Sequence, residues 1–560
     1  MGQGTGPPAL VIRGGTVVDG TGAPGVPADV ALAGDQIVGV GPGAKDTVAG
    51  LGEILELDAS GCIVCPGFID IHTHYDAQLL WDASLSSSCW QGVTTVITGN
   101  CGFAIAPAHE RHHDLLLGML HDLEDMSLET LQAGVSWEFG SFADYLSAIE
   151  VRHPTLNVGA YVGHSAIRIA VLGAEAYERA ATEVEVEHMR ALVYEALLAG
   201  AVGFSTSGAP TGRPSPTKHA TMEEVAAMLA ALSELNVGVG AFVPGPNVTH
   251  EALYDLQPGV GRPFTWTAIL GSIDGSHERL VTLHREGMAR GSDVHPQVTC
   301  RPLAAQMTMR SPFALRCDAV RELDRATDDE RRVAYRDAGW RARAAEQLAG
   351  SVLPVRWTHW SIAESAAHPE LEGRTVADVA AQRRVGGLDA MLDLSLEDGL
   401  TTRFGVVIMN DDPEQVADLL RLEGAVLGLA DSGAHPDQLC DAVMPTDLLG
   451  GWVRDRGALS LPQAVHKLTG EPAALYGFGD RGAVRPGSIG DVVVFDPDTI
   501  GPGPLRRVRD LPAEGERLVA DQPTGLRHVL VNGVAIRRDG AVVEADHGPG
   551  RVLRPLAGSG

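Results

Sequence analysis

The chain has 560 residues, of which 44% are hydrophobic and 21% charged, so it can form a large domain plus a smaller one with a buried core. The formal net charge of −29 argues against nucleic acid and anionic membranes as partners, because like charges repel. There is no long apolar span, and the opening segment Met1–Pro8 lacks the features of a signal peptide; we therefore expect a cytoplasmic protein. A homo-oligomer is compatible with the sequence.

The chain contains seven cysteines. An odd number in so long a chain argues against a disulfide framework. Cys62 and Cys65 form a CxxC pair within an apolar run, and no second pair follows at zinc-ribbon spacing. We therefore expect both to be buried small side chains.

Both ends of the chain have the pattern of short strands separated by turns. Turn signals such as Asp19-Gly20 and Gly34-Asp35 interrupt the apolar runs of the first 66 residues. Similar runs near the other end are separated by Asn532-Gly533 and Asp539-Gly540. We predict one discontinuous β-sandwich domain, formed by residues 1–66 and 476–560.

Residues 67–475 alternate between strands and helices. Glu183–Leu198 and Glu223–Leu235 have helical spacing of apolar residues. The expected strands are Phe68–Ile71, Thr94–Ile97, Asn157–Val162, Ala201–Phe204, Val237–Phe242, Phe264–Leu270, His295–Val298 and Ala425–Leu429. Eight strands with intervening helices predict the α/β class and a (β/α)8 barrel.

The alternation lapses between about residues 303 and 423, where helix and loop are mixed and rich in charge. This stretch is too long for a plain connection. We interpret it as an insertion after the seventh strand, on the catalytic face, where it would act as a lid.

The clearest chemical signal is Pro66-Gly-Phe-Ile-Asp-Ile-His-Thr-His74, which ends the first apolar strand of the barrel. His72 and His74 are two residues apart, so on a strand their side chains point to the same face. At the carboxyl end of a strand, such a pair can bind one cation. The pattern therefore predicts a metal site at these histidines.

Motifs spread over nearly the whole chain give a more specific signal. They are Pro66–Gln78, Gly92–Val96, Gly99–Phe103, Val162–Ser165, Ala201–Ser207, Leu429–His435, Leu475–Gly477 and Val484–Asp496. Together they resemble the amidohydrolase superfamily, and within it the D-aminoacylase (N-acyl-D-amino-acid deacylase) branch. The barrel of that superfamily, with a β-sandwich made from both chain ends, agrees with the organisation predicted above.

The resemblance implies roles for four residues. His72 and His74 would be ligands of a metal that is normally zinc, and Cys101 would be a thiolate ligand or bridge. Asp431 would contact the metal and act as general base, passing a proton from water to the leaving nitrogen. The alternatives are a buried loop cysteine at position 101 and a turn or cap residue at position 431.

The scarcity of lysine bears on the number of metal ions. Many binuclear amidohydrolases bridge two metals with a carboxylated lysine after the fourth strand. Here that strand runs into Phe204-Ser-Thr-Ser207, and Lys218 lies well beyond it in a loop rich in Pro and Gly. A centre with a carboxylated lysine is therefore not expected.

A second departure concerns the histidines that D-aminoacylases have at the ends of the fifth and sixth strands. The corresponding stretches, Gly240–Gly245 and Trp266–Ser272, contain none, and a basic residue that helps hold the substrate is also missing. His250 and His277 lie nearby in predicted loops, and we do not assign them as replacements. We therefore expect one zinc ion rather than two, bound by His72, His74, Cys101 and Asp431.

Four other residues are candidates for contact with a small-molecule substrate. His164 follows the third strand, and its alternative is a buried structural histidine. His435 lies four residues after Asp431, Arg301 follows the seventh strand, and Ser207 ends the fourth. Arg301 would pair with a substrate carboxylate; its alternative is a surface ion pair. Asp76 is expected to position the His-Thr-His loop.

The sequence supports three functions. The first is hydrolysis of a C–N amide bond in an N-acyl amino acid or a related small amide. The second keeps the single-metal site but acts on a cyclic amide or lactone, or catalyses a lyase or decarboxylase step. The third is a catalytically inactive relative that binds a ligand, which the two missing histidines favour and the four retained residues oppose.

Overall fold

The computed structural model describes residues 9–208, 214–351 and 355–555. It has two compact units, each described here by itself. Unit 1 comprises residues 1–300, 414–436 and 440–560, and unit 2 comprises residues 301–413 and 437–439. The segment Met1–Pro8, which we expect not to be a signal peptide, lies outside the described residues.

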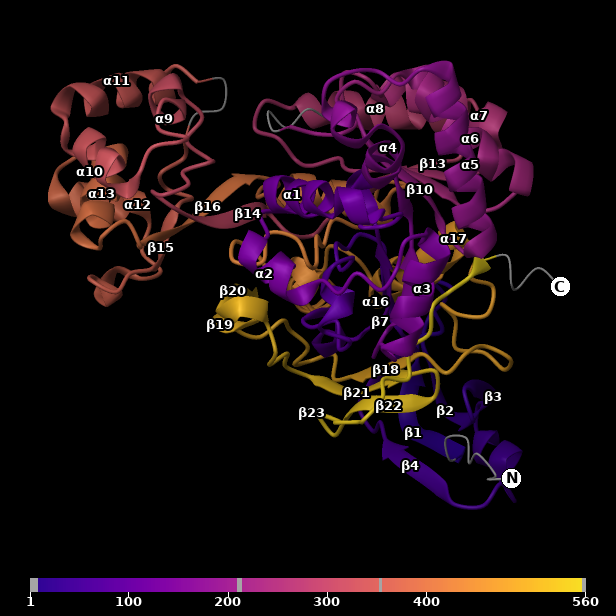
Figure 1. Ribbon diagram of the computed structural model, residues 1–560. Coiled ribbons are helices and arrows are strands. Elements are labelled where there is room, and N and C mark those ends of the chain that lie inside the picture. Colours follow the sequence, from indigo (N-terminus) through magenta and orange to yellow (C-terminus); the bar gives the residue numbers. More distant parts are fainter. Residues whose placement is uncertain (1–8, 209–213, 352–354, 556–560) are drawn as a thin grey trace. The chain divides into compact units, whose positions relative to one another are not determined.

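Strands from both ends of the chain pair in one nine-stranded sheet of unit 1 (Figure 1). The strands are β1 (Ala9–Val17), β2 (Val26–Ala33), β3 (Gln36–Val40), β4 (Ile54–Asp58), β5 (Ile63–Pro66), β18 (Val492–Phe495), β21 (Leu526–Val531), β22 (Val534–Arg538) and β23 (Ala541–Val542). The two ends meet where β5 pairs antiparallel with β18, Val64 opposite Val494. The predicted turn Asn532-Gly533 joins β21 to β22. The observed element is this one sheet, and a sandwich stays a prediction.

The middle of unit 1 contains parallel strands. The strands are β6 (Phe68–Asp70), β7 (Val93–Thr98), β8 (Asn157–Ala160), β9 (Val162–Gly163), β10 (Gly203–Ser207), β11 (Val239–Val243), β12 (Phe264–Trp266), β13 (Val294–Val298) and β17 (Val426–Leu427). They pair in the orders β6-β7-β8 and β9-β10-β11-β12-β13-β17, and only Tyr161 separates β8 from β9. A parallel bridge between Thr73 and Ser432 links the segments that follow β6 and β17. The predicted α/β class is confirmed.

Helices alternate with these strands along the chain. They are α1 (His113–Glu124), α2 (Leu128–Gly134), α3 (Phe142–Val151), α4 (His164–Leu172), α5 (Glu183–Ala199), α6 (Met222–Leu235), α7 (His250–Val260), α8 (Ser276–Ala289), α14 (Pro413–Leu420), α15 (Met444–Asp447), α16 (Leu461–Leu468) and α17 (Gly470–Tyr476). The two helices predicted from apolar spacing are confirmed as α5 and α6. A capping box between Thr182 and Glu185 begins α5 because it satisfies free N–H groups, and Gly200 in the left-handed conformation ends it.

The C-terminal part of unit 1 also contains a two-stranded hairpin, β19 (Arg506–Leu511) with β20 (Gly515–Val519). Cys62 and Cys65 are buried, as predicted, and all seven cysteines are free thiols. Among the described residues, no helix combines the length and the apolar character needed to cross a bilayer.

Unit 2 has its own fold and core. Its strands β14 (Leu303–Thr308), β15 (Ser361–Glu364) and β16 (Arg403–Met409) form an antiparallel sheet in the order β14-β16-β15. Its helices are α9 (Asp318–Arg321), α10 (Asp328–Arg336), α11 (Ala338–Ala349), α12 (Val376–Arg383) and α13 (Gly387–Glu397). Large side chains such as Tyr335, Trp340 and Phe404 fill its core. The sequence pattern did not predict this sheet.

The boundary of the insertion differs from the sequence estimate at its carboxyl end. Helix α14 falls inside the predicted 303–423 segment, but nearly all of it belongs to unit 1. The reason is its buried face: Val416, Leu419 and Leu420 pack in the large core of that unit.

Candidate metal centre

Four side chains of unit 1 meet around the Nε2 atoms of His72 and His74. The Sγ atom of Cys101 lies 3.4 Å from Nε2 of His72 and 3.9 Å from Nε2 of His74. Oδ1 of Asp431 lies 3.1 Å from Nε2 of His72 and 3.6 Å from Nε2 of His74. Both histidines are almost fully buried. The structure thus brings together the four residues predicted to bind metal, although more than 350 residues separate the first from the last.

The His-Thr-His segment is fixed to the loop that bears Asp431. The backbone N–H of His74 donates to the carbonyl of Ser432 at 2.7 Å. The buried carboxylate of Asp70 accepts from the N–H of His72 at 3.2 Å and from the hydroxyl of Ser432 at 3.3 Å. These bonds hold the ends of β6 and β17 together, so the histidines and the aspartate face each other.

The loop after β7 presents Cys101 through an unusual backbone conformation. Cys101 has a positive φ of 56°, between Gly99 at 80° and Gly102 at 79°. A Cβ on Gly99 would lie 2.6 Å from the carbonyl oxygen of Tyr161, so only glycine fits there. The hydroxyl of Ser205, on β10, donates to the carbonyl of Gly99 and accepts from the N–H of Gly102 at 3.1 Å. Ser205 therefore clamps the loop on both sides of the thiol.

Asp76 links the histidine loop to the cysteine loop, as expected. Its Oδ2 accepts from the hydroxyl of Thr98 at 2.5 Å and from the N–H of Gly99 at 3.0 Å. Burial raises the pKa of Asp76 to about 6, against the effect of these hydrogen bonds.

The outer ring nitrogens of the two histidines face different groups. Nδ1 of His72 lies 2.7 Å from the amide oxygen of Gln297 and 3.2 Å from the hydroxyl of Thr267. Nδ1 of His74 lies 3.3 Å from a carboxylate oxygen of Glu124. Sequence reasoning missed Gln297, Thr267 and Glu124. The sequence did carry a signal for Gln297 and Thr267, because each is a polar residue near the carboxyl end of an apolar strand. Glu124 ends a helix, and no sequence pattern marks it.

The charges of the site favour a bound cation. Burial alone would lower the pKa of His72, but the neighbouring Cys101 and Asp431 raise it to about 10. Burial would raise the pKa of Cys101 and of Asp431, but the two histidines lower both below their ordinary values. The two imidazoles and the two acidic groups therefore favour each other's charged forms. A divalent cation would take the place of the imidazole protons.

The donor set fits zinc. Ligand atoms of His72, His74 and Cys101 all lie within 4.8 Å of one another, and an oxygen of Asp431 approaches the same two imidazole nitrogens. Two imidazole nitrogens, a thiolate and a carboxylate are ligands that Zn²⁺ accepts in four-coordinate sites.

His250 and His277, the histidines closest in sequence to the ends of the fifth and sixth predicted strands, contact other residues. Thr267 follows β12 and contacts His72. His250 packs edge-on against Trp266 at 4.7 Å between ring centroids, and His277 bonds to Ser272. None of the described contacts of His250 or His277 involves the four converging residues.

His164 lies in a buried ionic network. Its Nδ1 is 2.7 Å from the hydroxyl of Thr206, and its Nε2 is 2.8 Å from a carboxylate oxygen of Glu224. Arg168 bonds to the same oxygen of Glu224 and to the carbonyl of Pro216. Because both ring nitrogens are engaged and the side chain is fully buried, the structural alternative is favoured over substrate contact.

His435 lies on the loop of Asp431 and is about one-quarter exposed, at 28%. Its Nδ1 lies 2.8 Å from a carboxylate oxygen of Asp125, and its backbone N–H donates to the carbonyl of Glu124 at 2.8 Å. Burial lowers the pKa of His435, but Asp125 and Glu124 raise it above its ordinary value overall. The raised pKa favours the charged form of the ring, which suits contact with an anionic substrate group.

The other two candidates are less informative. Ser207 is buried at the end of β10. Arg301 is the first residue of unit 2 and is partly exposed. Their contact with substrate stays a prediction.

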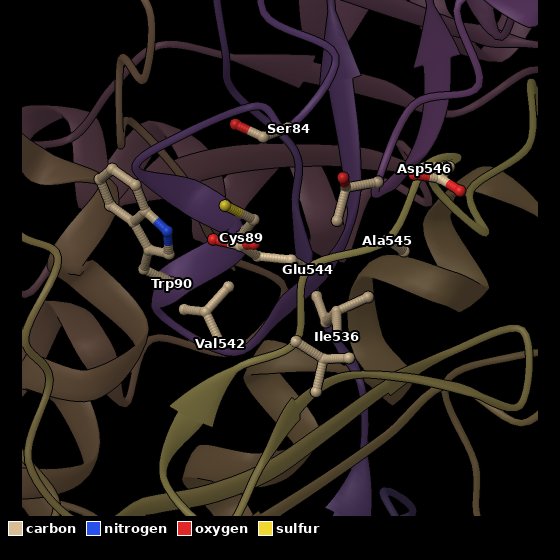
Figure 2. Close-up of a pocket in the computed structure, with 10 residues that line it drawn as sticks. Ser84, Cys89, Trp90, Ile536, Val542, Glu544, Ala545 and Asp546 are labelled. Atoms are coloured by element: carbon tan, nitrogen blue, oxygen red, sulfur yellow. The ribbon is translucent and has the colours of Figure 1, made fainter.

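A separate pocket of about 730 Å³ lies in unit 1 beside β23 (Figure 2). Trp90, Cys89, Ile536 and Val542 line it together with the acidic residues Glu544 and Asp546. None of the four converging residues takes part in its wall.

Comparison with known proteins gives matches over almost the entire chain. The model of the amidohydrolase family matches residues 55–536. The chain is 29% identical to D-aminoacylase of Alcaligenes xylosoxydans xylosoxydans over 555 residues, which is 98% of each protein.

Two solved structures are similar over comparable lengths. One is a D-aminoacylase described by its binuclear metal centre, with one-metal activation and second-metal attenuation; it is 28% identical, with a TM-score of 0.66 over 98% of this chain and all of the other. The second is N-acyl-D-glutamate deacylase of Bordetella bronchiseptica with zinc and a phosphonate inhibitor. It is 26% identical, with a TM-score of 0.64 over 97% of this chain and 99% of the other.

Proposed function

The chain belongs to the amidohydrolase family, and we propose that it is a zinc-dependent hydrolase of the amide bond in N-acyl-D-amino acids. One observation supports this above all: the donor atoms of Cys101 and Asp431 both face the Nε2 atoms of His72 and His74. The likeness to D-aminoacylase and to N-acyl-D-glutamate deacylase over nearly the full length supports the substrate class.

A zinc ion at this point would polarise the scissile carbonyl and make the attacking water more acidic. Asp431 would then act as the general base. Its carboxylate would take a proton from the attacking water and deliver it to the leaving nitrogen. The net reaction adds one water across the C–N bond and releases a carboxylic acid and an amine. The hydrogen bonds of the Ser432 backbone and side chain keep this carboxylate beside the histidines.

We propose one catalytic zinc ion per chain. The strands that carry extra histidines in D-aminoacylases end here in Phe242-Val243 and Trp266-Thr267. The described D-aminoacylase with one-metal activation supports the idea that one ion is sufficient for activity.

For the fold, we propose a closed (β/α)8 barrel at residues 67–475 and a discontinuous β-sandwich domain from residues 1–66 and 476–560. The barrel is supported by treating β8 and β9 as one strand, which gives eight parallel strands, and by the bridge between Thr73 and Ser432, which joins the first to the last. Catalytic residues of such barrels lie at the carboxyl ends of the strands. The insertion would be residues 301–413, which form most of unit 2.

For substrate recognition, we propose that His435 contacts the substrate carboxylate. Ser207 and Arg301 are further candidates, and His164 would act at most indirectly, through its bond to Thr206.

The test combines metal analysis with a substrate panel. Purified protein is assayed for bound metal and then incubated with matched N-acyl-D- and N-acyl-L-amino acids. Mass spectrometry measures the masses of the products. We expect one zinc per chain and products that account for one added water. Full activity in metal-free protein would refute the mechanism. Zinc binding without turnover of any amide would favour an inactive ligand-binding relative, and a product without added water would favour a lyase.

A further inference from the structure

Glu124 ends helix α1 with its carboxylate buried against His74. Its side chain is 4% exposed, and Oε1 lies 3.3 Å from Nδ1 of His74. That nitrogen is on the side of the ring opposite Nε2, the atom that faces Cys101 and Asp431. Glu124 therefore lies directly behind a predicted metal ligand.

Nδ1 of His74 has no aligned hydrogen bond within the part of the chain that the structure describes. Glu124 is within ion-pair distance but off the line that a hydrogen bond requires. A buried ring nitrogen without a partner is costly. A small rotation of either side chain would satisfy it.

The two histidine ligands differ in what stands behind them. His72 has the neutral amide oxygen of Gln297 at 2.7 Å, whereas His74 has an anion. A carboxylate accepting from the outer N–H of a metal-bound histidine fixes the ring and makes the other nitrogen a stronger ligand. The neutral amide of Gln297 therefore faces the outer nitrogen of His72, and the carboxylate of Glu124 faces the outer nitrogen of His74.

The backbone keeps Glu124 in this place. Asp125 has a positive φ of 52° and is the residue at which α1 ends. The carbonyl of Glu124 accepts from the backbone N–H of His435 at 2.8 Å. The carboxylate of Asp125 lies 2.8 Å from the ring Nδ1 of His435. The end of α1 is therefore attached to the loop that bears Asp431.

We propose that Glu124 is a positioning residue of the metal centre: it accepts the Nδ1–H of His74 when Nε2 of that ring binds zinc. This inference rests on the proposed function, because it requires that His74 is a ligand. Glu124 touches no reacting atom and acts only through His74.

The experiment measures zinc affinity by competition with a chelator, for the wild-type protein and for Glu124→Gln and Glu124→Leu. Loss of a residue that hydrogen-bonds to a metal ligand typically lowers metal affinity by about 10- to 100-fold. We expect a loss of about 10-fold for Gln, which keeps an acceptor oxygen but not the charge, and of about 100-fold for Leu. Asp114→Asn is the control, because it removes an exposed carboxylate from the first turn of the same helix. It should leave the zinc affinity unchanged.

Cobalt substitution separates this inference from the proposed function. A thiolate-to-cobalt charge-transfer band in the wild type, lost in Cys101→Ser, supports the donor set. Absence of that band and of tight metal binding in the wild type would refute the proposed function itself. A wild type with the band, alongside Glu124→Leu that binds zinc within about 3-fold of it, would overturn the role of Glu124 alone.

A measurement on the unmodified protein covers the case in which the variants do not fold. Nitrogen NMR of the zinc-loaded wild type should show His74 with a proton on Nδ1 in a strong hydrogen bond. The melting temperature of the metal-free proteins adds a further check, because a purely structural role would lower it without a specific loss of zinc affinity. A His74 ring bound to zinc through Nδ1, or one with an Nδ1–H that makes no hydrogen bond, would refute the inference.

Discussion

The amide oxygen of Gln297 lies 2.7 Å from Nδ1 of His72, although 225 positions separate the two residues in the chain. The contact fixes the ring so that Nδ1 carries the proton and Nε2 faces Cys101 and Asp431. Gln297 itself is buried on β13, where its amide also bonds to Thr265. The seventh parallel strand thus orients a ligand that belongs to the first.

Gln297→Leu should weaken zinc binding by about 10-fold, because His72 would lose the acceptor that orients it. Gln297→Glu keeps an acceptor oxygen at the same place and should bind zinc nearly as well as the wild type. Chelator competition measures both. Equal zinc affinity in wild type and the Leu variant would show that the amide does not support the ligand.

Asp431→Asn should lower kcat by at least about 10²-fold, because general acid–base catalysis contributes about 10²–10⁴-fold. The amide is nearly the same size, so the fold should persist, as the melting temperature of the metal-free protein would show. Initial rates with the best N-acyl-D-amino acid of the panel provide the test. An unchanged kcat with zinc in place would eliminate Asp431 as the base.

Ser205→Ala should loosen the loop that presents Cys101. The change leaves the buried N–H of Gly102 and the carbonyl of Gly99 without their present partner, at a cost of about 1–3 kcal/mol for the unsatisfied group. Unfolding in urea measures the free energy, and cobalt spectra report on the thiolate. Ser147→Ala, on the exposed face of α3, is the matched control. Equal losses in both variants would contradict a specific role for Ser205.

Glu224→Gln should destabilise the protein by about 3 kcal/mol, because it leaves Arg168 as a buried cation without its anion. Burial alone would raise the pKa of Glu224, but His164 and Arg168 lower it below its ordinary value of 4.5. The unfolded chain therefore takes up a proton near pH 4.5 that the folded chain resists, so this carboxylate stabilises the fold above that pH and less as the pH falls.

The pH dependence of Glu224→Gln provides a separate check. Wild-type stability should fall more steeply than that of the variant as the pH drops below about 4.5. Unfolding curves at a series of pH values give the difference between the two proteins, in which the other titrating groups largely cancel. Parallel curves would mean that Glu224 does not keep a depressed pKa in the folded state.

His435→Asn should raise KM for substrates with a free carboxylate more than for the same substrates blocked as methyl amides, because a ring beside Asp125 supplies positive charge. We expect a loss of about 10-fold in kcat/KM for the free acid. Asp125→Asn should produce a smaller change in the same direction. If blocked and free substrates lose equally, His435 does not bind the carboxylate.

The sequence by itself determined which residues are capable of the chemistry. The His-Thr-His segment, Gly-Asn-Cys-Gly and the late Asp431 are local patterns, and parallel strands of one sheet end at the same edge, so their meeting was predictable. The helices α5 and α6 were predictable too, since apolar spacing and a Thr182 cap act within a few residues.

Only the tertiary structure decided what stands around those ligands. Glu124, Gln297 and Thr267 reach the histidines from elements far away in the chain. Gln297 and Thr267 are recognisable as polar residues at strand ends, but which ring nitrogen they meet depends on packing, and no local pattern marks Glu124. Two further features also depend on contacts between distant parts of the chain. His164 lies in a buried network with Glu224 and Arg168, and α14 packs in the core of unit 1 rather than in the insertion. Burial and partner choice depend on which surfaces meet, and that is a property of the packed chain.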